Sequence, residues 1–128
     1  MIISFDFDGT LTNPKVAELA QTLVLKGHEV HIVTSREDPV VKYRNPDWNR
    51  DLFDTAHWIE IPYINIHFTN LNPKIVFFKT EPKFDIHIDD QIYEINDIEE
   101  SLTCKVHGVH FVSEDFKKLL SDLTALGI

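Results

Sequence analysis

Short runs of β-branched and aromatic residues alternate with segments of helical periodicity, and this alternation restricts the possible folds more than any other feature. Four runs lie at residues 2–7, 29–34, 63–69 and 85–88, and a weaker run lies at 105–112. Strands that alternate with helices form βαβ units, which give a parallel sheet covered on both faces. We therefore expect an α/β fold, a three-layer, Rossmann-like, doubly wound parallel sheet.

Three Asn-Pro pairs mark the expected helix starts, because Asn caps a helix well and Pro suits the first helical position. The pairs are Asn13-Pro14, Asn45-Pro46 and Asn72-Pro73. After the first pair, apolar residues recur at helical spacing from Val16 to Val24, and Gly27 favours a helix end there. After the second pair, the spacing predicts a helix over about 48–59. After the third pair the segment is short, and Ile75–Phe78 also fits a buried strand.

The length and charge of the chain bound its class. At 128 residues it matches one domain, residues 1–128, and its net charge of −9 disfavours nucleic-acid backbones and anionic membranes as general partners. The single cysteine, Cys104, points to a reducing compartment. The first residues lack the basic segment of a secretory signal, and no apolar run approaches the roughly 18 residues of a membrane span. We expect a cytoplasmic protein with no membrane partner.

Polar residues follow three of the apolar runs at the point where each run stops. These segments are Asp6-Phe7-Asp8-Gly9-Thr10, Thr34-Ser35-Arg36 and Asp89-Asp90. Ligands bind at the carboxyl ends of the strands in a parallel sheet, so we expect these side chains to converge. Clustered carboxylates repel one another, and a hard divalent cation such as Mg²⁺ relieves that repulsion. The candidate metal ligands are Asp6, Asp8, Asp89 and Asp90.

The order of these motifs resembles the haloacid dehalogenase-like superfamily of phosphohydrolases over residues 2 to about 100. The matching features are D-F-D-G-T, a strand-terminal Thr, a Lys that opens a helix and an Asp-Asp pair that ends a strand. The resemblance implies that Asp6 is the nucleophile and forms an aspartyl-phosphate. It also implies that Asp8 protonates the leaving oxygen and then takes a proton from the attacking water.

The resemblance further implies a Mg²⁺ site formed by Asp6, the backbone carbonyl of Asp8 and Asp89, with Asp90 completing it directly or through water. Thr34 would donate a hydrogen bond to a phosphate oxygen. A lysine would supply positive charge to the nucleophile and to the transferring group.

The motif does not settle which lysine this is, because Lys74, Lys79 and Lys83 all precede Asp89. We choose Lys74, since it lies in the first turn after Asn72-Pro73, where a helix N-terminus attracts anions. Lys79 is the reserve, and Lys83 is expected in the turn before the strand.

Most members of this superfamily carry an inserted cap domain, and this chain has no room for one at either usual place. Only Leu11–Asn13 separate the first motif from the first helix, and Asn70–Leu71 bridge the third strand to Asn72. We therefore expect a minimal core without a cap, whose open site accepts a bulky substrate or relies on a partner for closure. The expected substrates are a phosphorylated small molecule, such as a nucleotide, or a nucleic-acid end.

Three residues beside the motifs, Thr10, Ser35 and Arg36, are candidates for substrate binding. The long connection from residue 36 to 47 is the densest basic stretch of the chain. Its basic and aromatic residues, with those just beyond it, are Arg36, Lys42, Tyr43, Arg44, Trp48 and Arg50. The stretch loosely resembles the corresponding region of capless polynucleotide 3′-phosphatase domains, and such residues can hold phosphate and stack on bases.

The alternative is a non-catalytic regulatory module that binds phosphate or accepts it from a partner, as response-regulator receivers do. In receivers an acidic pair comes first and the phosphorylated Asp follows, whereas here Asp89-Asp90 comes last, which favours the enzyme. These residues do not separate a hydrolase from a phosphotransferase. The strand histidines His31, His67 and His87 are expected to be packed, and Trp58, Phe77 and Phe78 are assigned to the core.

Overall fold

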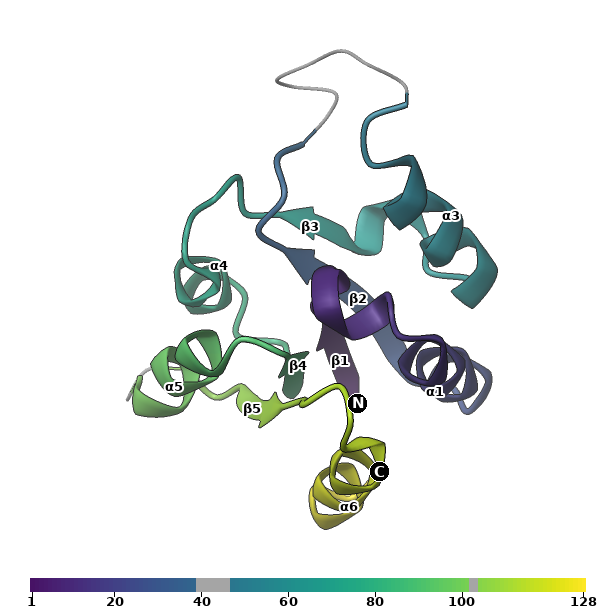
Figure 1. Ribbon diagram of the computed structural model, residues 1–128. Coiled ribbons are helices and arrows are strands. Elements are labelled where there is room, and N and C mark those ends of the chain that lie inside the picture. The colour runs from purple at the N-terminus through teal and green to yellow at the C-terminus, as the bar shows by residue number, and fades with distance from the viewer. Residues whose placement is uncertain (39–46, 102–103) are drawn as a thin grey trace.

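The computed structural model describes residues 1–38, 47–101 and 104–128. Its five strands are all parallel and form one sheet in the order β3-β2-β1-β4-β5 (Figure 1). The strands are β1 (Ile2–Phe5), β2 (Glu29–Thr34), β3 (Ile66–Phe68), β4 (Ile86–Asp89) and β5 (His107–His110). The helices are α1 (Pro14–Leu25), α3 (Arg50–Ile59), α4 (Lys74–Thr80), α5 (Ile92–Glu100) and α6 (Phe116–Ala125).

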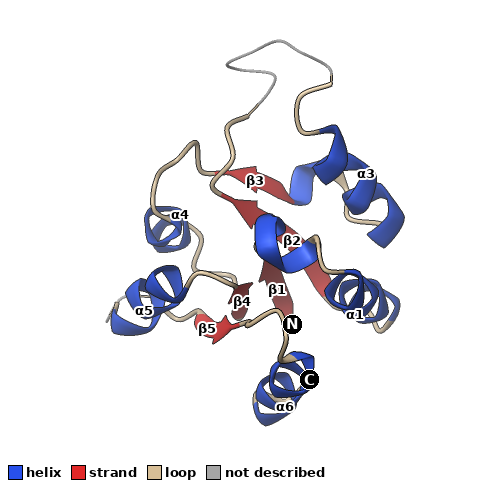
Figure 2. Ribbon diagram, viewed as in Figure 1, coloured by secondary structure: helices blue, strands red, loops and turns tan. Residues whose placement is uncertain are grey.

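Helices cover both faces of this sheet. Helices α4 and α5 lie on one side, and α1, α3 and α6 lie on the other (Figures 1 and 2). Successive residues of a strand point to opposite faces, so Ile32 of β2 joins the core beneath α1 and α3, while Val33 joins a smaller core with Phe78 and Ile98. The expected three-layer, Rossmann-like α/β architecture is confirmed.

The Asn-Pro pairs predict the helix starts unequally well. Asn13 caps α1, since its side chain accepts a hydrogen bond from the Lys15 backbone at 3.0 Å, and Pro14 takes the first helical position. The second pair lies outside the described residues, and the helix expected from residue 48 begins at Arg50. The third pair precedes α4, so the alternative of a buried strand at Ile75–Phe78 is wrong.

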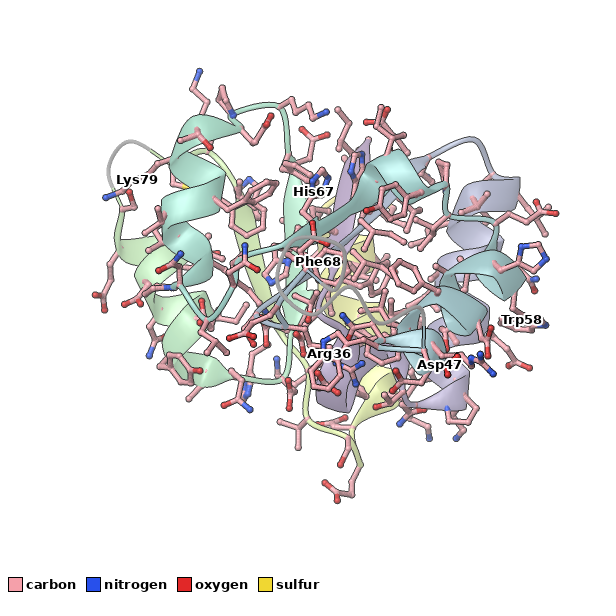
Figure 3. The ribbon with its side chains drawn as sticks, turned by 90° about the horizontal axis from the view of Figure 1, so that it is seen from above. Arg36, Asp47, Trp58, His67, Phe68 and Lys79 are labelled. Carbon is pink, nitrogen blue, oxygen red and sulfur yellow. The ribbon has the colours of Figure 1, made fainter. Side chains whose placement is uncertain are left out.

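Three other expectations differ from the structure. The strand expected over 63–69 is confined to β3, because Tyr63–Asn65 form one 3₁₀ turn after Pro62. Helices α5 and α6 were not expected. Trp58 is 49% exposed rather than buried and lies at the outer edge of the molecule (Figure 3), because other residues at helical spacing form the core face of α3. The residues of that face are Leu52, Ala56 and Ile59.

The strand order places β1 in the centre, with β2 on one side and β4 on the other. The chain runs outward through β2 and β3, then crosses back to β4 and β5, so its direction of winding reverses between β1 and β4. In open parallel sheets this is the point where a crevice forms beyond the carboxyl ends of the strands. In the described parts of the chain, no helix has the length and apolar character needed to cross a bilayer.

Candidate active site

The first motif begins where β1 ends, at the reversal point of the sheet. Asp6 is 5% exposed, and its backbone N–H donates to the carbonyl of Ile88 at 2.8 Å, which fixes the end of β1 against β4. The chain then turns sharply through Phe7–Leu11, with Gly9 at a φ of 78°. A Cβ on Gly9 would lie 2.2 Å from Oδ2 of Asp90, so only glycine allows this close approach between the two acidic motifs.

Lys74, the first residue of α4, reaches the end of the sheet and is 2% exposed. Its Nζ donates to Oδ1 of Asp6 at 2.7 Å and to Oδ2 of Asp89 at 2.5 Å. Its backbone N–H donates to Oε2 of the buried Glu94 at 3.0 Å, which anchors the start of α4 on α5. The reserve candidate, Lys79, is exposed on the outer side of α4 (Figure 3). The structure therefore brings Lys74, and not Lys79, to the carboxylates.

A second buried contact supports Asp89 from within the sheet. Nε2 of His87 lies 2.9 Å from Oδ2 of Asp89, and its Nδ1 lies 2.8 Å from the hydroxyl of Ser4, which is paired with His87 across β1 and β4. All three residues are 0% exposed. Burial lowers the pKa of His87, against the opposing effect of Asp89. A neutral ring that donates from Nε2 and accepts from Ser4 at Nδ1 satisfies both contacts.

The charges of this cluster are unequally balanced. Burial raises the pKa of Asp6 to about 8, with a further rise caused by Asp89, although Lys74 opposes the shift. Burial also acts to raise the pKa of Asp89, but the contacts with His87 and Lys74 outweigh it and lower that pKa to about 2. For Lys74, burial is outweighed by the two aspartates, which raise its pKa. Lys74 and Asp89 are thus charged in this cluster, and a divalent cation bound beside Asp6 would lower the pKa of Asp6 and favour its carboxylate form.

The acidic group fits a divalent cation. One carboxylate oxygen from each of Asp6, Asp89 and Asp90 lies within 4.8 Å of the others. Oδ1 of Asp90 is buried and has no hydrogen-bond partner among the described residues, and such an orphaned oxygen calls for an explanation such as an ion. Lys74 binds one oxygen of Asp6 and one of Asp89. The other oxygen of each accepts a further hydrogen bond, and its second lone pair could still bind a cation. An all-carboxylate set suits a hard ion such as Mg²⁺.

Asp8, the fourth predicted carboxylate, lies outside this acidic group as far as its side chain is concerned. It is 57% exposed at the side chain, and Arg36 at the end of β2 binds it through two hydrogen bonds of 2.7 and 2.9 Å. Arg36 also binds Asp51 and Asn49, which adjoin the start of α3. The predicted substrate-binding arginine is therefore engaged with protein carboxylates.

The predicted hydroxyls occupy different positions. Thr10 is fully buried and donates to Oδ2 of Asp6 at 3.3 Å, so it orients the acid. Thr34 is also fully buried, and its hydroxyl accepts the backbone N–H of Arg36 at 3.2 Å. Ser35 is exposed and lines a hollow of about 170 Å³ over the acids. The lining residues are Asp6, Asp8, Ser35, Lys74, Asp90, Gln91, Tyr93 and Glu94.

Several residues of this site were not expected from the sequence. They are Ser4, His87, Gln91, Tyr93, Glu94, Asn49 and Asp51. Of the basic stretch, Lys42, Tyr43 and Arg44 lie outside the described residues. Arg50 forms an ion pair with Asp47 on the surface, three residues before it, and does not reach the site.

The fold and the site together define a class: an α/β protein with an acidic cluster and a buried lysine at the reversal point of a parallel sheet. No protein-family model matches the chain, and neither does any curated protein or solved structure. The resemblance to phosphohydrolases therefore depends on the sequence motifs.

Proposed function

We propose that this protein is a Mg²⁺-dependent phosphomonoester hydrolase of the haloacid dehalogenase-like type, which acts through an aspartyl-phosphate on nucleotides or on nucleic-acid ends. One observation carries the proposal. Asp6, at the end of the central strand, contacts the ammonium group of Lys74 beside Asp89 and Asp90, and it lines a hollow that Asp8 also lines. These residues would supply the nucleophile, the fixed positive charge, the cation ligands and the proton carrier that the reaction needs.

In the first half of the reaction, a carboxylate oxygen of Asp6 attacks phosphorus, and the bond between phosphorus and the leaving oxygen breaks. Asp8 gives its proton to that oxygen, so the product leaves as an alcohol. In the second half, water attacks the phosphorus of the aspartyl-phosphate and Asp8 takes up a proton from it. The bond from phosphorus to Asp6 then breaks, which releases inorganic phosphate and restores both acids.

The surrounding residues supply charge and orientation. The ammonium group of Lys74 lies 2.7 Å from Asp6 and would offset negative charge that accumulates on the transferring group. Asp6, Asp89 and Asp90 would hold Mg²⁺, which when bound would offset the repulsion between carboxylate and phosphate. The hydrogen bond from Thr10 to Asp6 leaves the other oxygen of Asp6 to Lys74 and thereby fixes the orientation of the carboxylate.

The test is hydrolysis of para-nitrophenyl phosphate by the purified protein with and without Mg²⁺. Turnover is expected only with the ion, to be lost on chelation, and to fall by about 10³-fold or more in Asp6→Asn. The matched control is Asp54→Asn, which removes an exposed carboxylate from α3 and leaves turnover unchanged. Equal turnover in wild type and Asp6→Asn would remove Asp6 as the nucleophile.

The same sample separates the enzyme from a phospho-acceptor module. After treatment with a small phosphodonor such as acetyl phosphate, an enzyme releases inorganic phosphate continuously. A regulatory module instead retains one phosphoryl group per chain, which intact-protein mass spectrometry detects. The exposed Asp8, within two residues of Asp6 and lining the same hollow, favours release.

A further inference from the structure

The guanidinium group of Arg36 is fully occupied by protein oxygens. Its Nε and Nη2 donate to Asp8 at 2.9 and 2.7 Å, and its Nη1 and Nη2 donate to Asp51 at 2.8 and 2.9 Å. The remaining Nη1–H donates to Asn49 at 3.0 Å. Arginine has five N–H donors, so all five are used. The guanidinium carbon also lies 4.8 Å from the centre of the Phe7 ring, which holds the plane in place.

These contacts are incompatible with the proton transfer that we propose for Asp8. Both oxygens of Asp8 accept hydrogen bonds from a permanent cation, and a carboxylate held in this way is an acceptor and not a proton donor. Asp8 must therefore leave Arg36 before it can protonate a leaving group. Its departure would expose the Nε–Nη2 edge of Arg36 without a partner, while the other edge stays on Asp51.

The Asp8–Arg36 pair also connects two hollows. Asp8 lines the hollow of about 170 Å³ over Asp6 and Lys74. Arg36 lines a larger one of about 410 Å³, in which it is the cationic residue among the described lining residues. The larger hollow has room for more of a substrate than the phosphoryl group, and a fork of two N–H donors suits a phosphate better than any neutral group.

From these contacts we infer that the substrate is a phosphomonoester with a second phosphate group, and that this second group displaces Asp8 from the Nε–Nη2 edge of Arg36. The second phosphate then accepts the two hydrogen bonds that Arg36 gave to Asp8. The freed Asp8 takes up a proton from water and gives it to the leaving oxygen. Asp51 keeps Arg36 in place during the exchange. The inference rests on the phosphatase proposal and assigns its substrate class: nucleoside bisphosphates, or nucleic-acid ends whose neighbouring phosphodiester supplies the second anion.

The experiment compares kcat/KM for two probes, a nucleoside monophosphate and the same nucleoside with a second phosphate on its other sugar hydroxyl. The wild type is expected to prefer the bisphosphate by about tenfold or more, as for one bidentate charged contact. Arg36→Gln is expected to bring this ratio to within about twofold of one, while turnover of the monophosphate rises because Asp8 is no longer held. Damage to the fold would instead lower both rates.

Two further variants test whether the preference depends on the fork of Arg36. Arg36→Lys keeps the charge without the fork, so its preference is expected to lie between those of wild type and Arg36→Gln. Arg50→Gln removes an arginine that pairs with Asp47 on the surface and contacts neither Asp8 nor Asp51. This variant is therefore expected to retain the full preference. No preference in the wild type, or a preference that survives Arg36→Gln, would overturn the inference and leave the phosphatase proposal standing.

A failure of the phosphatase proposal gives a different result, since neither probe is then hydrolysed with Mg²⁺. In that case the affinity of each probe for Asp6→Asn, measured by isothermal titration calorimetry without turnover, still tests the role of Arg36. Tighter binding of the bisphosphate that is lost when Arg36→Gln is added supports the second-phosphate site. Equal binding of both probes overturns it.

Discussion

Two cationic side chains of this protein, Lys74 and Arg36, each lie between two aspartates. The lysine cluster and the arginine cluster formed in this way differ in their exposure to water. The flanking residues are Asp6 and Asp89 for Lys74, and Asp8 and Asp51 for Arg36. In the lysine cluster no side chain is more than 7% exposed. In the arginine cluster the exposed fractions are 24% for Arg36, 57% for Asp8 and 61% for Asp51. The charges are alike, but their surroundings are not.

This difference separates a fixed part of the site from an exchangeable one. Buried charges have lost their hydration, so each depends on its partners, and removing one partner leaves the others uncompensated. The lysine cluster is therefore suited to hold the nucleophile rigidly. Exposed charges keep part of their hydration and contribute little net stability, so a phosphate or a water molecule can replace a partner at low cost. The arginine cluster is suited to change partners during turnover.

The largest effect on stability is expected for Lys74→Met. This change keeps the volume but leaves Asp6 and Asp89 buried beside each other without their ammonium partner, and we expect a loss of about 3–5 kcal/mol in the free energy of unfolding. Urea unfolding measures it, in buffer with a chelator so that no cation compensates. The matched control is Lys79→Met on the exposed side of α4, expected to stay within about 0.5 kcal/mol of wild type. Equal losses in the two variants would contradict the fixed role of Lys74.

A smaller loss in the free energy of unfolding, of about 2 kcal/mol, is expected for His87→Leu. This change removes the imidazole donor from the buried Asp89. It also leaves the Ser4 hydroxyl with only the carbonyl of Ile86, at 3.4 Å, as a partner. His87→Gln keeps an N–H donor and is expected to recover part of the loss. Urea unfolding gives the stabilities, and the ¹⁵N chemical shifts of the His87 ring give its tautomer. A ring protonated at Nδ1 instead of Nε2 would refute the assigned contact.

The sequence predicts the central sheet and α1 well because these elements depend on local patterns. β1, β2 and β4 are dense apolar runs, and Asn13 fixes the start of α1. Helix α6 lies outside the predicted elements, although Phe116, Leu119 and Leu123 follow helical spacing and indicate a helix there. Helix α5 is harder to predict, since its isoleucines are three residues apart within an acidic segment.

The residues of the candidate site likewise divide into those that local patterns predict and those that depend on contacts between elements. Asp6, Lys74 and Asp89 were predictable because parallel strands end at one edge and a helix begins there. The contact between His87 and Ser4 depends on the register of β4 against β1, which neither strand encodes alone. Asp51 meets Arg36 only because α3 begins beside the end of β2, a tertiary arrangement without a local signature. The missed residues are thus those whose partners come from other elements.

Arg36→Gln provides the direct contrast with Lys74→Met. Because both aspartates of the arginine cluster are more than half exposed, we expect a loss of only about 1 kcal/mol in the free energy of unfolding. The loss is also expected to shrink between low salt and about 0.5 M NaCl, since ions screen exposed charges far more than buried ones. Urea unfolding at the two salt concentrations measures both variants. A salt-independent loss of the size expected for Lys74→Met would show that the two clusters do not differ in kind.

The smallest effect concerns the pH dependence of the contact between Asp51 and Arg36. Hydrogen bonds from Arg36 lower the pKa of Asp51 below its ordinary value of 3.8. The unfolded chain therefore binds a proton at a pH where the folded protein still keeps Asp51 ionised, so the contact stabilises the fold above that ordinary value and its contribution disappears as the pH falls through the lowered pKa. The difference in unfolding free energy between wild type and Asp51→Asn should be constant from neutral pH to about pH 5 and shrink below about pH 4. Because the Asp51 carboxylate is 61% exposed, we expect this difference in unfolding free energy to be no more than about 0.5 kcal/mol.

An NMR titration of the Asp51 carboxyl carbon gives the more sensitive measurement, because the midpoint of that titration should rise in Arg36→Gln. Identical midpoints in the two proteins would mean that Arg36 does not hold Asp51 in solution, and the anchor required for the exchange at Asp8 would be absent.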